Sequence, residues 1–125
     1  RVDVTYPFYQ GLRHRLLLAS KKSEATTFEG GVYAAVQGPR LESAAEIDRM
    51  EKDGVTIVGM TGMPEAALAR ELSISYASIC PIANQAAGRG NSRDGISHEE
   101  IKKQSLSMMD NVMTVITNFV EQNDN

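Results

Sequence analysis

The chain has 125 residues, of which 42% are hydrophobic and 23% are charged, a composition that suits a packed domain or part of one. It excludes a disordered low-complexity chain. With 13 basic and 16 acidic residues the net charge is −3, so we expect no binding to nucleic acid. No apolar run is long enough to cross a bilayer, so we expect no membrane partner. The single Cys80 excludes an internal disulfide framework, and the absence of a signal peptide predicts a cytoplasmic protein, although the first residue is Arg1 rather than Met.

The N-terminal part predicts a helix followed by interrupted β structure. Leucines and an alanine recur at helical spacing over about 11–20 and predict a short helix there. Residues 26–29 and 32–36 are rich in β-forming side chains, and two glycines separate them. We therefore expect two short β segments with a break between them.

A helix with clear boundaries follows. Ser43 and Glu46 have the spacing of a capping box, in which the serine caps the first turn and the glutamate reaches back. Gly54 is a typical residue just beyond a helix C-terminus. The apolar run 55–60 then predicts a buried parallel strand.

The second half continues this alternation. Residues 64–72 predict a helix that starts at a proline, and 76–83 predict the next strand, although this segment also contains a proline. Residues 86–95 contain three glycines and predict an exposed loop, after which Ser97 and Glu100 form a second capping box. The long terminal helix presents an apolar stripe made of Met108, Val112, Ile116 and Phe119. The order of elements predicts an α/β fold with a mostly parallel sheet.

Three segments begin where predicted strands end, which is where ligands bind in open α/β sheets. The first, 37–43, carries Glu42 beside a helix N-terminus, where the carboxylate is either a solvated acid or an acceptor for a ligand. The second, 60–65, places the Thr61 hydroxyl and backbone N–H groups where an anion could bind, or where they only form a turn. The third, 84–87, contains Asn84, whose amide can donate and accept at once, or serve only the turn.

The histidines and the cysteine give weaker evidence for a functional site. His14 and His98 have the positions of surface residues, and Cys80 has that of a small buried hydrophobe. These three are too scattered to predict a metal site, and no glycine-rich phosphate motif or nucleophile elbow is present. Composition and spacing therefore predict an α/β domain with an anion site as its functional hypothesis.

Two strings of residues carry a resemblance to a known family. Positions 38–47 read GPRLESAAEI, and positions 58–71 read VGMTGMPEAALARE. Together they resemble the purine nucleoside phosphorylase / methylthioadenosine phosphorylase family. The resemblance covers nearly the whole chain but only the C-terminal half of a family member, without the half that carries the glycine–serine/threonine and Arg-His phosphate contacts. It implies that residues 1–125 are the C-terminal half of a single phosphorylase-type α/β domain, in which helices flank a mixed, mostly parallel sheet.

The resemblance implies phosphorolysis, in which phosphate and a purine nucleoside give a free purine and a ribose 1-phosphate. The transition state resembles an oxocarbenium ion, so the site must hold phosphate and stabilise the departing base. By motif, Met60 would lie against the ribose, Thr61 would bind phosphate, and Leu41 would pack on the purine, where many relatives have Phe. Inorganic phosphate would be a co-substrate, with no cofactor and no metal, and the family usually assembles as a homotrimer.

The resemblance also bears on the identity of the base. Adenosine-type members pair the purine with aspartates after the last strand, whereas 83–86 read ANQA here, with Ala86 among the substrate-binding positions. Asn84 can donate to a 6-oxo group and accept from a protonated N7, which makes it the candidate catalytic residue. Glu42 can accept from N1–H, which a 6-oxopurine has and adenine lacks. We therefore predict 6-oxopurine nucleosides as substrates over adenine nucleosides.

The 5′ substituent of the nucleoside separates the remaining alternatives. Residues 62–68 and 84–88 are most similar to family members that act on S-methyl-5′-thioinosine, which is the first prediction. His98 is similar to the histidine that meets the 5′-hydroxyl in inosine and guanosine phosphorylases. Those nucleosides and methylthioadenosine remain alternative substrates. A fragment without catalysis is a further alternative, because the phosphate-binding half has no counterpart in these residues.

Overall fold

The computed structural model describes residues 1–122 and confirms the predicted alternation of helices and strands. In chain order the elements are α1 (Gln10–Ser20), β1 (Tyr33–Ala35), α2 (Ala44–Lys52), β2 (Ile57–Gly59), α3 (Gly62–Glu71), the 3-10 helix η1 (Gly90–Ser92) and α4 (His98–Glu121). The two strands pair in parallel, so the chain has the predicted α/β character.

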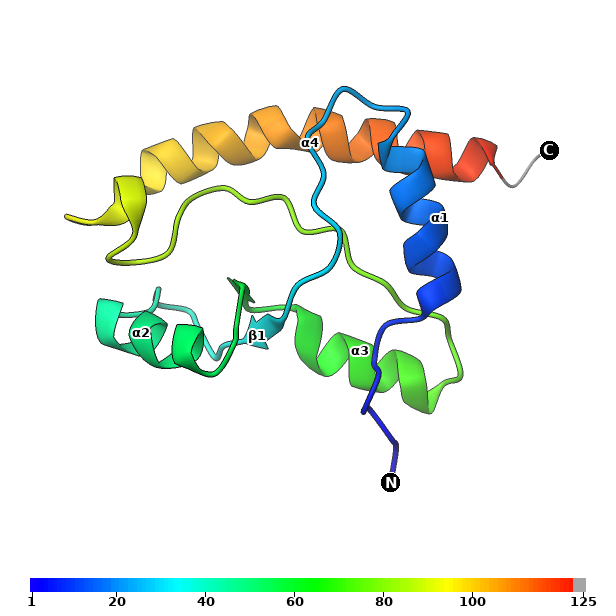
Figure 1. Ribbon diagram of the computed structural model, residues 1–125, viewed down its shortest axis with the longest axis horizontal. Helices are drawn as coiled ribbons and strands as arrows, with labels where there is room; N and C mark the ends of the chain where they lie inside the picture. The colour runs from blue at the N-terminus through cyan, green and yellow to red at the C-terminus, as the bar shows by residue number, and fades with distance from the viewer. Residues whose placement is uncertain (123–125) are drawn as a thin grey trace.

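The elements form two layers (Figure 1). α4 runs along one side of the molecule, and α2, the strands and α3 form a row along the other. α1 joins the layers at one end, where it packs against α4. The irregular stretch 73–96 runs between the layers and returns the chain to the start of α4. This arrangement places α2 and the first turn of α4 at the same end of the molecule.

The register of the two strands defines the edge from which the candidate loops leave. Tyr33 lies opposite Ile57, and Ala35 lies opposite Gly59. The Val36 amide continues the ladder by donating to the Gly59 carbonyl at 2.9 Å. Both strands are shorter than predicted, but they are parallel, so their carboxyl ends lie at the same edge. The loops that follow them therefore start side by side.

Local signals in the sequence account for α2. The Ser43 hydroxyl accepts from the Glu46 amide, and the Glu46 carboxylate accepts from the Ser43 amide, which confirms the predicted capping box. At the other end Gly54 has a φ of 86°. The amides of Gly54 and Val55 donate to carbonyls of the last turn and form a Schellman motif. Both ends of this helix are thus specified within a few residues.

α3 has an irregular start and a regular body. Met63 has φ −124° and ψ 137°, so the continuous helix begins at Pro64, as the sequence predicts. The helix ends at Glu71, and Ser73 adopts the left-handed region with a φ of 56°. Glycine is the usual residue at this position beyond a helix, so serine is strained there.

α4 is capped at its start and held to α1 near its end. The Ser97 hydroxyl accepts from the Glu100 amide at 3.3 Å, which confirms the serine half of the predicted capping box. The Asn118 side chain donates to the Ala19 carbonyl at 3.2 Å. This bond joins residues 99 positions apart in the sequence, so it belongs to tertiary packing rather than to local structure.

The predicted stripe of α4 is half-buried at Met108, Val112 and Phe119 and differs only at Ile116. Val115 is buried, whereas Ile116 is 39% exposed. Residue 115 lies three positions before Asn118, on the face that meets α1. Ile116 points about 100° away from that face, because successive helical residues are rotated by that angle.

Two predicted strands are wrong within the described residues. Residues 26–29 form no strand, and Phe28 is 84% exposed, so this segment lacks a packed neighbour. Residues 76–83 form no ladder, and Pro81 within them lacks an amide donor. A strand needs a second strand to bond with, and the apolar pattern alone cannot supply it.

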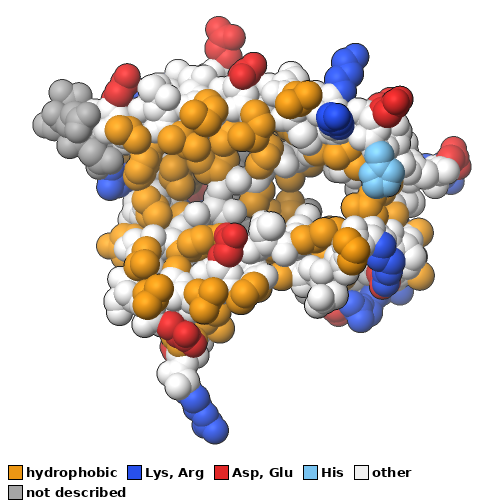
Figure 2. Space-filling view, turned by 180° about the vertical axis from the view of Figure 1, so that it is seen from behind, with side chains coloured by type: hydrophobic (Ala, Val, Ile, Leu, Met, Phe, Trp, Pro, Cys, Tyr) orange, Lys and Arg blue, Asp and Glu red, His pale blue; other side chains and the backbone are white. Residues whose placement is uncertain are grey.

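The apolar core is small for a chain of this size. The buried apolar side chains of residues 1–122 are Ala19, Ile47, Met50, Ala66, Ala69 and Val115. Many larger apolar side chains are exposed, and Figure 2 shows hydrophobic side chains gathered along α4 and over the layer below it. Within residues 1–122, no helix combines the length and the apolar character needed to cross a membrane.

Candidate functional site

The loops that follow the two strands lie against each other. β1 leads into the loop 36–43, and Met60 directly follows β2. The Met60 sulfur lies so close to Gly38 that a Cβ added to the glycine would sit 2.6 Å from it. Gly38 also has a φ of 61°, so only glycine allows both this backbone and this approach. Met60, the predicted ribose contact, therefore lies against the loop that carries Glu42.

The third predicted segment reaches the same region through α2. A Cβ added to Gly88 would lie 2.9 Å from the Cβ of the first residue of α2. Arg89 forms ion pairs with Asp48 and Glu51 on later turns of that helix, at 2.7 and 2.6 Å. These contacts hold the segment against the helix that follows the first loop.

A hollow of about 410 Å³ opens beside the first loop. Its lining includes the loop up to Gly38 and the side chains of Arg40, Glu42, Glu46 and Arg49. Two arginines and two glutamates suit a polar ligand with both acceptors and donors. Glu42 is the predicted binding residue that borders the hollow. The other predicted positions do not line it: Leu41, Met60, Thr61, Asn84, Ala86 and His98.

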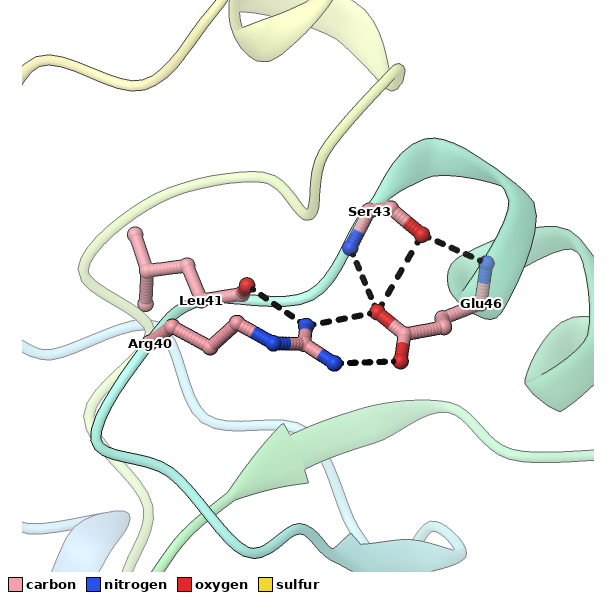
Figure 3. Close-up of polar contacts among 4 residues, drawn as sticks. All are labelled: Arg40, Leu41, Ser43 and Glu46. Atoms are coloured by element: carbon pink, nitrogen blue, oxygen red, sulfur yellow. Dashed lines mark hydrogen bonds and ion pairs between the residues drawn. The ribbon is translucent and has the colours of Figure 1, made fainter.

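A charged network orders the loop beside this hollow (Figure 3). The Arg40 guanidinium donates to the two Glu46 carboxylate oxygens, both at 2.8 Å, and to the Leu41 carbonyl at 3.1 Å. The same carboxylate accepts from the Ser43 amide at 2.8 Å. Hydrogen bonding from Arg40, and then from the Ser43 amide, lowers the pKa of Glu46 to about 2. Glu46 is therefore ionised throughout the neutral range.

The N-terminus of α3, the predicted phosphate position, is covered by a tyrosine. The amides of Thr61 and Gly62 both donate to the Tyr33 hydroxyl, at 3.3 and 3.2 Å. The Tyr33 ring lies against Gly59 and Gly62 and leaves no room for a Cβ at either position. The Thr61 hydroxyl does not cap the helix. The backbone amides expected to bind an anion are thus present, but here they donate to the neutral Tyr33 hydroxyl.

The predicted base-contacting residues come from two loops. Asn84 is exposed, and its side-chain nitrogen donates to the neighbouring Gln85 carbonyl at 2.7 Å. The Gln85 side chain in turn accepts from the Asn91 amide at 2.9 Å, which closes this loop on itself. Leu41 and Ala86 are half-buried. Both loops contact the start of α2, which brings the two groups of residues to one region.

The two histidines and the cysteine do not line the hollow. His98 is exposed at the first position of α4, and His14 is exposed on α1. Cys80 is half-buried with its sulfur 3.3 Å from the Ser78 hydroxyl, so the prediction of a buried hydrophobe is wrong. Within residues 1–122, no group of three or more His, Cys, Asp or Glu side chains is arranged to hold a metal ion.

Sequence reasoning misses two residues of this region. Arg40 lies in an irregular loop, where no periodicity indicates its partner, although its position before a capping-box glutamate is a usable signal. Tyr33 meets an amide 28 residues further along the chain, so its role depends on strand register. The glycines at 59 and 62 were the available signal for Tyr33, because they indicate that another group approaches the backbone closely.

Known proteins with similar sequences share one family. The family model described as Phosphorylase superfamily matches residues 1–121. A relative from Pseudomonas syringae pv. tomato, named probable S-methyl-5′-thioinosine phosphorylase, is 53% identical over 88 residues, which cover 70% of this chain and 36% of the relative. A relative from Thermococcus kodakarensis, named probable 6-oxopurine nucleoside phosphorylase, is 36% identical over 120 residues, which cover 96% of this chain and 44% of the relative.

A solved structure supports the same fold. A double mutant of adenosine/methylthioadenosine phosphorylase from Schistosoma mansoni, in complex with adenine, superimposes with a TM-score of 0.89 and 21% sequence identity. The match covers 99% of this chain and 49% of that protein. At this identity the likeness concerns the fold alone. The chain therefore spans between 36% and 49% of the length of these three proteins.

Proposed function

The chain belongs to the phosphorylase superfamily, and we propose that this protein catalyses the phosphorolysis of a 6-oxopurine nucleoside. The proposed substrate is S-methyl-5′-thioinosine, and the products are hypoxanthine and a methylthioribose 1-phosphate. Inorganic phosphate is the co-substrate, and no cofactor takes part. The name of the P. syringae relative supports this nucleoside, and that of the T. kodakarensis relative supports a 6-oxo base.

The position of Glu42 on the lining of the hollow is the observation that supports the choice of base. A carboxylate only accepts hydrogen bonds, so it pairs with the N1–H of a 6-oxopurine and leaves the N1 acceptor of adenine without a donor. Asn84 complements it, because one amide can donate to O6 and accept from N7–H. No carboxylate occurs in 83–86 to accept from the 6-amino group of adenine.

The chemistry assigns one task to each part of the site. A phosphate oxygen forms the new bond to C1′ while the bond from C1′ to N9 breaks and its electron pair leaves with the purine. Negative charge then grows on the base, and Asn84 stabilises it by donating to O6. The proton that the phosphate gives up ends on N7, and the Asn84 carbonyl oxygen accepts from this N7–H. Phosphate binds at Thr61 and the amides of the α3 N-terminus in place of the Tyr33 hydroxyl. Met60 covers the ribose, and Leu41 forms an apolar wall for the purine.

In this proposal, residues 1–125 form the C-terminal half of one nucleoside phosphorylase domain. The chain spans less than half of each protein it matches in length. A sheet of two strands is marginal by itself, which favours further strands from elsewhere. α4 also carries an exposed apolar stripe with alternating spacings of three and four: Leu106, Met109, Met113, Ile116 and Val120. This spacing is typical of a helix face that packs against a neighbour.

Two further candidates have specific support. The exposed position of His98, at the same end of the molecule as α2, favours an inosine or guanosine phosphorylase in which this side chain meets a 5′-hydroxyl. The second candidate is a fragment that folds or associates without catalysis, because the chain matches less than half the length of each of these three proteins. A homotrimeric assembly in the cytoplasm remains our prediction from the family resemblance. Sedimentation equilibrium of the natural protein tests the trimer.

The experiment compares three nucleosides on the protein at its natural length, which its intact mass establishes. Release of free purine is measured with phosphate and with methylthioinosine, inosine or methylthioadenosine. We expect methylthioinosine to be used with a kcat/KM on the order of 10⁴ above that of methylthioadenosine, as a site with buried polar pairs can achieve. Equal use of these two nucleosides contradicts the proposed base. A mass equal to that of the 125 residues, with no turnover, supports the fragment without catalysis.

A further inference from the structure

We propose that Arg40 and Glu46 are positioning residues that fix the backbone on both sides of Glu42. The ligand assigned to Glu42 rests on the proposed function. The contacts that fix the loop do not depend on that function. Neither side chain needs to touch the base. Their task is to hold the Glu42 carboxylate in one direction, so that its hydrogen bond to N1–H forms without further ordering of the loop.

Hydrogen bonds hold the residues on both sides of residue 42 (Figure 3). Arg40 donates to the Leu41 carbonyl at 3.1 Å, and this carbonyl belongs to the peptide group that precedes Glu42. Glu46 accepts from the Ser43 amide at 2.8 Å, and this amide belongs to the peptide group that follows Glu42. The two parallel bonds of 2.8 Å between Arg40 and Glu46 connect these two anchors. Both peptide planes next to Glu42 are thus held, which restricts the two backbone angles between them.

The anchor is rigid because Glu46 belongs to α2. The two buried residues of that helix, Ile47 and Met50, lie one and four positions after Glu46 and fix the orientation of the helix against the core. A planar guanidinium that bonds both oxygens of a carboxylate is directional, whereas a lysine would supply only a point charge. The Arg40 and Glu46 side chains are 70% and 38% exposed, so their attraction adds little to global stability. Their effect is therefore expected on the loop rather than on the folded state as a whole.

The same helix offers a matched control. Arg89 also pairs with carboxylates of α2, Asp48 and Glu51, and its side chain is more buried than that of Arg40. Its ion pairs lie on later turns and do not involve the loop 40–43. Substitution of Arg89 by alanine removes two ion pairs to α2. It does not release the peptide groups beside Glu42.

The experiment compares Arg40→Ala, Arg40→Lys and Arg89→Ala with the wild type in the protein at its natural length. Amide hydrogen exchange reports on residues 41–43, calorimetry gives the affinity for hypoxanthine, and steady-state kinetics separate KM from kcat. We expect Arg40→Ala to raise exchange at Ser43 and to weaken hypoxanthine binding about 10- to 100-fold, because small displacements of a binding group cost this much. Arg40→Lys should recover only part of the affinity, and Arg89→Ala should leave exchange at Ser43 unchanged.

The outcomes separate this proposal from the proposed function. If the wild type binds hypoxanthine and Arg40→Ala binds it equally well with unchanged exchange, the positioning role is wrong and the proposed function stands. If Arg89→Ala raises exchange at Ser43 as much as Arg40→Ala does, the effect belongs to α2 as a whole and the role is also wrong. If the wild type binds no hypoxanthine, the proposed function fails and the assigned role fails with it. In that case the exchange data still decide whether Arg40 fixes the loop.

Discussion

Substitution of Gly59 by alanine tests how the end of β2 and the start of α3 are assembled. A Cβ at this position would lie 2.7 Å from Cζ of the Tyr33 ring, closer than such contacts normally occur. Gly59 has no left-handed φ, so the backbone accepts alanine and the whole conflict lies with Tyr33. The ring must move, and its hydroxyl then leaves the amides of Thr61 and Gly62.

The expected cost follows from these two effects. Overpacking of this kind costs about 1–3 kcal/mol. Loss of the hydrogen bond to the buried Gly62 amide adds about 0.5–1.5 kcal/mol. The exposed Thr61 amide can bond to water instead, so its loss adds little. We expect Gly59→Ala to lower the free energy of unfolding by about 2–4 kcal/mol.

A double-mutant cycle with Tyr33→Ala is the assay. The free energy of unfolding is measured by denaturant titration for both single variants and the double variant. In the Tyr33→Ala background the added methyl group has room, so Gly59→Ala should cost less than about 0.5 kcal/mol. The coupling energy should therefore reach about 2 kcal/mol. Strict additivity of the two substitutions would refute the packing of Tyr33 on Gly59.

Three further predictions concern α2, its charged pair and the 5′ position. Ser43→Ala removes the side-chain half of the capping box and should lower the free energy of unfolding by about 1 kcal/mol, measured by urea titration. The pKa of Glu46 is lowered from 4.5 to about 2, so the stability it contributes is fully present above pH 4.5 and is lost as the pH falls toward 2. Because the pair is exposed, unfolding measured from pH 5 to pH 2 should show only a small loss of stability in the wild type, and less of it in Arg40→Ala. His98→Ala should reduce kcat/KM for inosine and leave methylthioinosine unaffected, whereas unchanged kinetics on both nucleosides would remove the 5′ role.

The parts of the fold that sequence predicts well are specified within a few residues. The capping box at Ser43 and Glu46 and the glycine stop at Gly54 involve hydrogen bonds between near neighbours. The same holds for the start of α4, where Ser97 accepts from Glu100. Such signals need no knowledge of the rest of the chain, so the helices are placed correctly from the sequence.

The failures concern structure that depends on distant partners. Residues 76–83 have the composition of a strand but have no ladder, since composition does not say what lies beside a segment. On α4, Val115 rather than the predicted Ile116 is buried, because Asn118 on the same face meets Ala19 on a separate helix. Tyr33 covers the α3 N-terminus because β1 and β2 pair in one particular register. None of these contacts follows from a local pattern.

In the candidate site, too, some features follow from the sequence and others depend on contacts that the sequence does not indicate. The ends of β1 and β2 do place Met60 beside the loop that carries Glu42, as expected for parallel strands. The structure adds that Arg40 bonds to Glu46 and to the Leu41 carbonyl, which no periodicity in the loop could indicate. The binding roles of these residues remain predictions, because they concern a ligand rather than the fold.

The kcat/KM ratio for methylthioinosine over methylthioadenosine, measured for the wild type and for Glu42→Gln, tests the central claim most directly. A glutamine can donate to the N1 of adenine, whereas the carboxylate of Glu42 can only accept from the N1–H of hypoxanthine. Loss of a hydrogen bond to a charged group costs about 1.5–3 kcal/mol, so Glu42→Gln should lower this ratio by about 10- to 100-fold. A wild type that prefers methylthioadenosine, or a ratio that Glu42→Gln leaves unchanged, would contradict the assignment of Glu42 to a 6-oxopurine.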